Sequence, residues 1–285
     1  MAERLYDSIP SLDLADFTSG DTTRKVQFVK DLGDAYENIG FVAIKNHGLS
    51  DDLQDKLYST VKKFFALPRE IKQKYEFEEL QGQRGYIGRG KEQAKGFDTP
   101  DLKEFFHVGQ ECTDEEAAAD SELTSYPRNV WVEELPELQQ VTVEVYRTLE
   151  AAGMNILRAI ALHLGLDENY FDPKIKNGNS ILRPIYYYPL DPETTDPKAV
   201  RAAQHGDINL ITLLMGASAD GLQVLRRDGK WIGVTSLPKQ VIVNVGDMLD
   251  RHTNHRLKST IHRVVNPPKE KMNTERFSIP FFMHP

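Results

Sequence analysis

From Ser180 onward the sequence consists of short apolar runs separated by turns, and this texture constrains the possible folds more than any other feature. The clearest pair of runs is 221–225 and 230–234, which flank a turn containing Asp228 and Gly229. Asp-Gly between two apolar runs is typical of a tight β-hairpin. A series of short strands with turn signals between them predicts an antiparallel barrel or a jelly roll.

Helical patterns dominate the chain before these strands. Apolar residues recur at helical spacing over 22–38 and over 138–164, and Ser50 stands where it can cap a further helix. The segments 41–44 and 103–108 are apolar enough to predict strands. The acidic stretch from Thr113 to Glu122 is expected to be an exposed connection.

These patterns together predict an α+β fold with a mainly β core and supporting helices. We expect residues 1–125 to form an N-terminal extension of helices and strands that packs on the core. Residues 126–285 are expected to hold a long brace helix and the core itself, whose strands occupy about residues 178–285.

Candidate metal ligands stand inside the strand-rich region. His205 and Asp207 are two residues apart, so on an extended strand their side chains share one face and can chelate one divalent metal. By itself the pair is a weak signal, because the chain has 8 histidines and 43 acidic residues. His262 follows in a second apolar segment and is preferred over His252 and His255, which stand at a turn. Two histidines and one carboxylate on one face of a metal are typical of non-haem Fe(II) oxygenases.

A candidate anion site lies fourteen residues beyond His262. Arg276 and Ser278 share a face of an extended segment, and the residues after them are apolar. A guanidinium fork beside a hydroxyl suits the distal carboxylate of a dicarboxylate, through two parallel charge-assisted hydrogen bonds. An arginine on the surface of an edge strand is the alternative. Its apolar surroundings favour a buried arginine with an anionic partner.

These three elements resemble the Fe(II)/2-oxoglutarate-dependent dioxygenases, and within them the isopenicillin N synthase-like group. The segment from Asn38 to Phe41 and the segment from Asn46 to Leu49 are similar to the N-terminal signature of this group. The resemblance covers nearly the whole chain. It implies a double-stranded β-helix, or jelly roll, around the metal site.

The resemblance also implies the chemistry and further contacts. Fe(II) would be held by the two histidines and the carboxylate, and 2-oxoglutarate would bind the iron while Arg276 and Ser278 grip its far end. With O2 the enzyme would form succinate and CO2 while it hydroxylates, desaturates or cyclises a small organic molecule. Family members often use a tyrosine near the cosubstrate, and Tyr186 or Tyr188 matches that position loosely. Apolar residues such as Leu213 and Val264 would exclude water.

Composition limits the partners. A net charge of -8 without a basic stripe argues against nucleic-acid and anionic-membrane binding, and no run of about 18 apolar residues is present. The single Cys112 excludes an internal disulfide framework and fits a reducing cytoplasm. We expect a cytoplasmic monomer acting on a small-molecule substrate. Because the sequence ends at Pro285, we also expect a pocket that is more open than usual for the group.

Three alternatives stay open on the sequence. An isopenicillin N synthase-like Fe(II) oxidase would keep the same ligands without using 2-oxoglutarate. A zinc-dependent hydrolase or lyase could use a similar ligand set. A non-catalytic ligand-binding jelly roll is the third, although it has no need for two histidines, one aspartate and an anion fork together.

Overall fold

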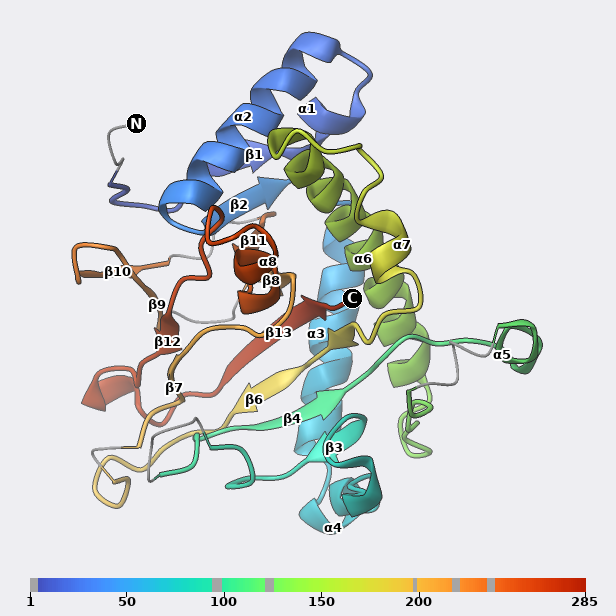
Figure 1. Ribbon diagram of the computed structural model, residues 1–285. Helices are drawn as coiled ribbons and strands as arrows, with labels where there is room; N and C mark the ends of the chain where they lie inside the picture. Colours follow the sequence, from blue (N-terminus) through green and yellow to red (C-terminus); the bar gives the residue numbers. More distant parts are fainter. Residues whose placement is uncertain (1–4, 94–98, 121–125, 197–198, 217–220, 235–238) are drawn as a thin grey trace.

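The computed structural model describes residues 5–93, 99–120, 126–196, 199–216, 221–234 and 239–285. Within these residues two β-sheets face each other, and helices cover the outer face of the larger sheet (Figure 1). Almost every strand pairing is antiparallel, and β1 with β2 is the parallel exception. The described structure is therefore a mixed sheet assembly with supporting helices.

The larger sheet has nine strands in the order β1-β2-β11-β8-β13-β6-β4-β3, with β5 paired to β13. Its strands are β1 (Ser11–Asp13), β2 (Phe41–Lys45), β3 (Gly85–Ile87), β4 (Glu104–His107), β5 (Ile181–Leu182), β6 (Ile185–Tyr187), β8 (Ile211–Met215), β11 (Val241–Val245) and β13 (Arg276–Met283). The smaller sheet has four strands in the order β10-β9-β12-β7, which are β7 (Ala202–His205), β9 (Leu222–Leu225), β10 (Trp231–Gly233) and β12 (His262–Val264).

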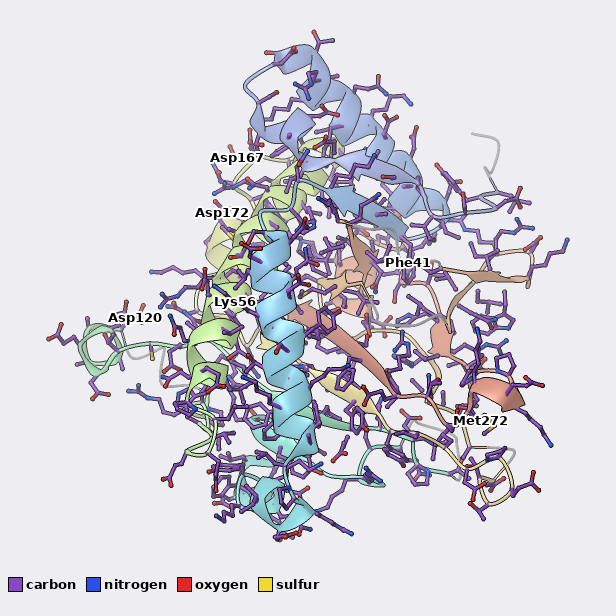
Figure 2. All side chains as sticks on the ribbon, turned by 180° about the vertical axis from the view of Figure 1, so that it is seen from behind. Phe41, Lys56, Asp120, Asp167, Asp172 and Met272 are labelled. Carbon is purple, nitrogen blue, oxygen red and sulfur yellow. The ribbon has the colours of Figure 1, made fainter. Side chains whose placement is uncertain are left out.

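The helices of the described part lie mainly before the small sheet in the sequence. They are α1 (Leu14–Thr18), α2 (Thr22–Asn38), α3 (Asp51–Ala66), α4 (Arg69–Gln73), α5 (Asp114–Ala119), α6 (Glu137–His163), α7 (Asp172–Ile175) and α8 (Asp247–His252), with short 3-10 turns at Glu78–Leu80 and Lys269–Lys271. Seen from behind, α3 and α6 run side by side across the large sheet (Figure 2). None of these helices, within the described residues, combines the length and the apolarity needed to cross a bilayer.

The inner strands of the large sheet are buried on both faces. On β2, Val42 and Ile44 join the core beneath the helices, whereas Phe41 and Ala43 join the core between the two sheets. Successive side chains of a strand point to opposite faces, so a continuous apolar run is what a strand in this position requires. On each central strand, therefore, alternate side chains face the helices and the others face the space between the two sheets.

Several expectations from the sequence are confirmed. Helix α2 covers 22–38 and is capped by Asp21, and α3 follows Ser50, whose hydroxyl accepts from the backbone N–H of Leu53. The expected hairpin is formed by β9 and β10. The acidic stretch expected to be an exposed connection is largely exposed from Thr113 to Asp120, and its residues 121–122 lie outside the described part of the chain. It also forms a helix that was not expected, α5, with a capping box between Thr113 and Glu116. The Thr-x-x-Glu pattern was the signal for it.

Gly40 lies between α2 and β2 and has a conformation that only glycine adopts without strain. Its φ is +72°, and a Cβ atom added there would stand 2.1 Å from the carbonyl oxygen of Lys258. Lys258 belongs to the segment that leads into β12. Close approach at Gly40 therefore helps to position the strand that carries His262.

Replacing Gly40 by alanine should destabilise the fold more than the same change at Gly20, whose φ is +82° and whose added Cβ would meet nothing within 4 Å. Backbone strain alone costs about 1 kcal/mol at Gly20, whereas Gly40→Ala adds overpacking of about 1–3 kcal/mol. Chemical denaturation of both variants measures this difference. Equal losses would show that the contact with Lys258 relaxes without cost.

Candidate metal centre

The two histidines and the aspartate come together between the sheets. His205 ends β7, His262 begins β12, and the two are direct partners in the antiparallel register. Their ring centroids are 4.4 Å apart. One ligand atom from each of His205, Asp207 and His262 lies within 4.8 Å of the others. Asp207 lies just beyond the end of β7, so the turn rather than a continuous strand brings it to the same side.

Backbone contacts decide which nitrogen of each imidazole faces the centre. The Nδ1 atom of His205 lies 2.6 Å from the carbonyl oxygen of Ala203, and that of His262 lies 3.2 Å from the carbonyl oxygen of Thr260. A carbonyl can only accept, so these contacts favour the proton on Nδ1. Both Nε2 atoms are left to face Oδ1 of Asp207, at 3.9 Å from His205 and 3.7 Å from His262.

The aspartate is oriented by two hydrogen bonds from the large sheet. Its Oδ2 accepts from the hydroxyl of Thr212 at 2.6 Å and from the side-chain amide of Asn244 at 2.8 Å. Oδ1 is thereby directed toward the imidazoles. Metal-binding carboxylates and histidines are commonly fixed by such outer contacts.

Electrostatics favour the metal-binding protonation states of Asp207 and His205. Burial alone would raise the pKa of Asp207, but His262, His205 and the hydrogen bonds from Asn244 and Thr212 lower it overall. Burial, followed by the neighbouring His262, lowers the pKa of His205. A carboxylate and a neutral imidazole are the forms that ligate a divalent cation. The donor set thus fits Fe(II) on grounds of geometry and charge.

The triad lines a cavity whose opposite wall is β13. Arg276, Ser278, Pro280 and Phe282 alternate along this strand and all face the cavity. Arg276 and Ser278 are buried, at 1% and 4% exposure. The sequence prediction that these two side chains share a face is therefore confirmed, and the structure places them in the same cavity as the triad.

The tyrosine beside Arg276 differs from the sequence expectation. Tyr187 pairs with Arg276 in the register and lines the cavity, and the guanidinium lies 4.9 Å from its ring centroid. Tyr186 points to the helix side and stacks on Phe277. Tyr188 lies outside the cavity lining, beneath the guanidinium of Arg89. Tyr186 and Tyr188 share one face of the chain and Tyr187 has the other.

The same alternation of side chains along a strand changes which leucine of β8 lines the cavity. Val264 lines the cavity as expected, but Leu214 rather than Leu213 does so from β8, because Leu213 packs beneath the helices. The competing histidines are elsewhere. His252 contacts Tyr170, and His255 is exposed beside Asp250.

Thr212 and Asn244 were missed at the sequence level. Each is a buried polar residue within an otherwise apolar strand, at 3% exposure. A buried polar group costs free energy unless it has a partner. A polar residue in such a run was therefore the available signal, although the sequence does not name its partner.

Proteins of known family resemble this chain over both its N-terminal and its C-terminal part. Residues 178–285 match the family described as the 2OG-Fe(II) oxygenase superfamily, and residues 9–134 match the family described as non-haem dioxygenase in morphine synthesis N-terminal. A relative from Emericella nidulans, the 2-oxoglutarate-Fe(II) type oxidoreductase hxnY, is 34% identical over 96% of this chain and 78% of its own. The chain belongs to the 2OG-Fe(II) oxygenase superfamily.

Two solved structures resemble this oxygenase over nearly its whole length. One, from Caulobacter crescentus, is of a protein assigned to the 2OG-Fe(II) oxygenase family, with 39% identity and a TM-score of 0.84, covering 97% of this chain and 86% of that one. The other is of a full-length Neurospora crassa protein in complex with alpha-KG and thymine, with 33% identity, a TM-score of 0.85 and the same coverage.

This oxygenase is an Fe(II)- and 2-oxoglutarate-dependent dioxygenase of the isopenicillin N synthase-like group, and its substrate is a small molecule. It uses Fe(II), 2-oxoglutarate and O2. The alternative of an oxidase that does not use 2-oxoglutarate is not favoured, because the relatives are named for that cosubstrate. Membership of this family also disfavours the two remaining alternatives, a zinc-dependent hydrolase or lyase and a non-catalytic ligand-binding protein.

Removing the hydroxyl that holds Asp207 should weaken metal binding by this oxygenase. Thr212→Val keeps the side-chain shape but removes one of the two hydrogen bonds to Oδ2, so we expect the Fe(II) dissociation constant to rise about 10-fold. Anaerobic calorimetric titration measures it. Thr142→Val is the matched control, because Thr142 is fully buried in α6 and, among the described residues, its hydroxyl bonds to carbonyl oxygens of its own helix. Unchanged affinity in Thr212→Val would contradict the assigned role.

Proposed function

We propose that His205, Asp207 and His262 are the iron ligands of this dioxygenase, and that Arg276 and Ser278 bind the distal carboxylate of 2-oxoglutarate. The product class would be a hydroxylated, desaturated or cyclised small molecule. The observation that carries the proposal is the convergence of two Nε2 atoms and Oδ1 in one cavity with a buried arginine.

The proposed fold of the core is a double-stranded β-helix formed by the two facing sheets. Apolar side chains from both sheets meet in one core, including Phe41, Ile185, Val224 and Val264, which supports this arrangement. We place the core with its brace helix in residues 126–285 and an N-terminal extension in residues 1–125. Strands β1 to β4 of the extension lie at the two edges of the large sheet.

The cosubstrate site is proposed at the β13 wall. A guanidinium offers two parallel N–H donors that match a carboxylate, and each charge-assisted hydrogen bond contributes about 1.5–3 kcal/mol. Ser278 adds a hydroxyl two residues along the same face. Tyr187 replaces Tyr186 and Tyr188 in the proposal, because its ring stacks against Arg276 inside the cavity.

The chain's own residues would act by holding and orienting. Iron and 2-oxoglutarate, when bound, supply the oxidising chemistry that consumes O2, releases succinate and CO2 and functionalises a C–H bond. Thr212 and Asn244 keep Oδ1 of Asp207 directed at the centre. Leu214 and Val264 would exclude water from the cavity wall.

The proposal is tested by 2-oxoglutarate turnover with succinate as the readout, together with the absorbance of the anaerobic Fe(II)–2-oxoglutarate complex. His262→Ala should abolish both signals. Arg276→Ala should keep metal binding but raise the KM for 2-oxoglutarate about 10- to 100-fold, since it loses the charge-assisted bonds.

His255→Ala is the matched control for the histidine change, because His255 is exposed and lies outside the cavity. It should retain both signals. Succinate formation by His262→Ala at the normal rate would overturn the ligand assignment. An unchanged KM in Arg276→Ala would overturn the cosubstrate assignment.

A further inference from the structure

A second arginine faces the cavity, and the proposed function does not use it. Arg183 lies between β5 and β6 and lines the same cavity as the triad. Its Nε donates to Nε2 of His107, and its Nη1 donates to Oε1 of Glu92 at 3.1 Å. Within the described chain, Nη2 has no hydrogen-bond partner. The two N–H groups of Nη2 are thus available to a ligand.

The guanidinium plane is fixed by aromatic rings. Its central carbon lies 4.5 Å from the ring centroid of Phe105 and 5.0 Å from that of Phe282. Phe105 is buried behind Arg183, whereas Phe282 is half-buried and lines the cavity. Cation–π contacts of this kind strengthen when water is excluded. Arg183 is therefore a preorganised donor beside an aromatic surface.

His107 orients Arg183 by accepting a hydrogen bond from it. Burial, followed by the charge of Arg183, lowers the pKa of His107 well below its ordinary value, so the ring is neutral. Its Nδ1 lies 2.7 Å from the carbonyl oxygen of Gly82, which requires the proton on Nδ1. Nε2 is then an acceptor, as the contact from Arg183 demands.

The charges around Arg183 balance. Lys103 also lines the cavity, and its Nζ lies 2.7 Å from Glu92 and 2.8 Å from Asp101. Burial alone would raise the pKa of Glu92, but Arg183 and Lys103 lower it to about 2, so it is ionised. Two cations thus face two carboxylates. This wall therefore offers a directed N–H donor without a surplus positive charge.

We propose that Arg183 and Phe282 recognise the primary substrate, and that this substrate is a neutral, planar ring bearing a carbonyl group. The carbonyl oxygen accepts from Nη2 of Arg183, and the ring packs on Phe282. An anionic substrate gains little from a charge-balanced wall, and a puckered ring packs poorly on a flat aromatic face. The inference rests on the proposed function, because it places the substrate beside the same iron ligands.

The probes are thymine, 5,6-dihydrothymine and orotate, each added to the Fe(II) holoenzyme with 2-oxoglutarate and O2. Thymine is neutral and planar, dihydrothymine keeps the carbonyls on a puckered ring, and orotate is planar but anionic. We expect thymine to stimulate succinate formation most. Arg183→Lys keeps the charge but loses the planar fork, so the KM for thymine should rise about 10- to 100-fold.

Comparing the KM for thymine with the KM for 2-oxoglutarate separates a loss of substrate recognition from a general disturbance of the active site. In Arg183→Lys, the KM for thymine should rise far more than the KM for 2-oxoglutarate. Phe282→Leu should lose the stimulation of succinate formation by thymine, whereas Phe282→Tyr keeps an aromatic ring and should retain it. Arg89→Lys is the matched control, because Arg89 also stacks on a ring, 3.9 Å from the centroid of Tyr188, but lies outside the cavity. It should keep both KM values.

Three results would overturn the inference while leaving the proposed function intact, provided that the enzyme has a normal anaerobic Fe(II)–2-oxoglutarate absorbance. The first is an unchanged thymine KM in Arg183→Lys. The second is a stimulation by dihydrothymine or orotate that equals or exceeds that by thymine, and the third is no response to thymine. Loss of that absorbance in the unmodified enzyme would instead contradict the proposed function.

Discussion

The burial of the large sheet on both faces is the constraint on which the rest of the structure depends. Because α3 and α6 cover one face and the small sheet covers the other, each central strand sends alternate side chains to the helices and to the cavity. On β13 this alternation sends Phe277 and Ile279 to the helix side and Arg276 and Ser278 to the cavity. A slip of one residue would exchange the two sets and remove the site.

Polar groups in that cavity are kept by matched partners. Asn244 on β11 holds Asp207, and Lys103 links two carboxylates beside Arg183. Such partners make burial of charge tolerable and fix orientation at the same time. Most of the cavity's other lining is apolar, which strengthens these electrostatic interactions.

The sequence predicted the long helices, the hairpin and the meeting of His205, Asp207 and His262, because local periodicity and ligand chemistry are both visible in one chain. It named Tyr186 and Tyr188, whereas Tyr187 lines the cavity, since a run of three tyrosines does not show which one faces it. Only the pairing of Tyr187 with Arg276 decides that. The hydrogen bond from Asn244 to Asp207 spans 37 residues of sequence, so local patterns cannot reveal it.

The central claim is that one iron is bound by two imidazoles and one carboxylate between the sheets. A crystal structure grown anaerobically with Fe(II) and 2-oxoglutarate tests it most directly. We expect one metal bound by Nε2 of His205, Oδ1 of Asp207 and Nε2 of His262, at about 2.0–2.2 Å from each. A metal bound at other residues, or through Nδ1 of either histidine, would contradict it.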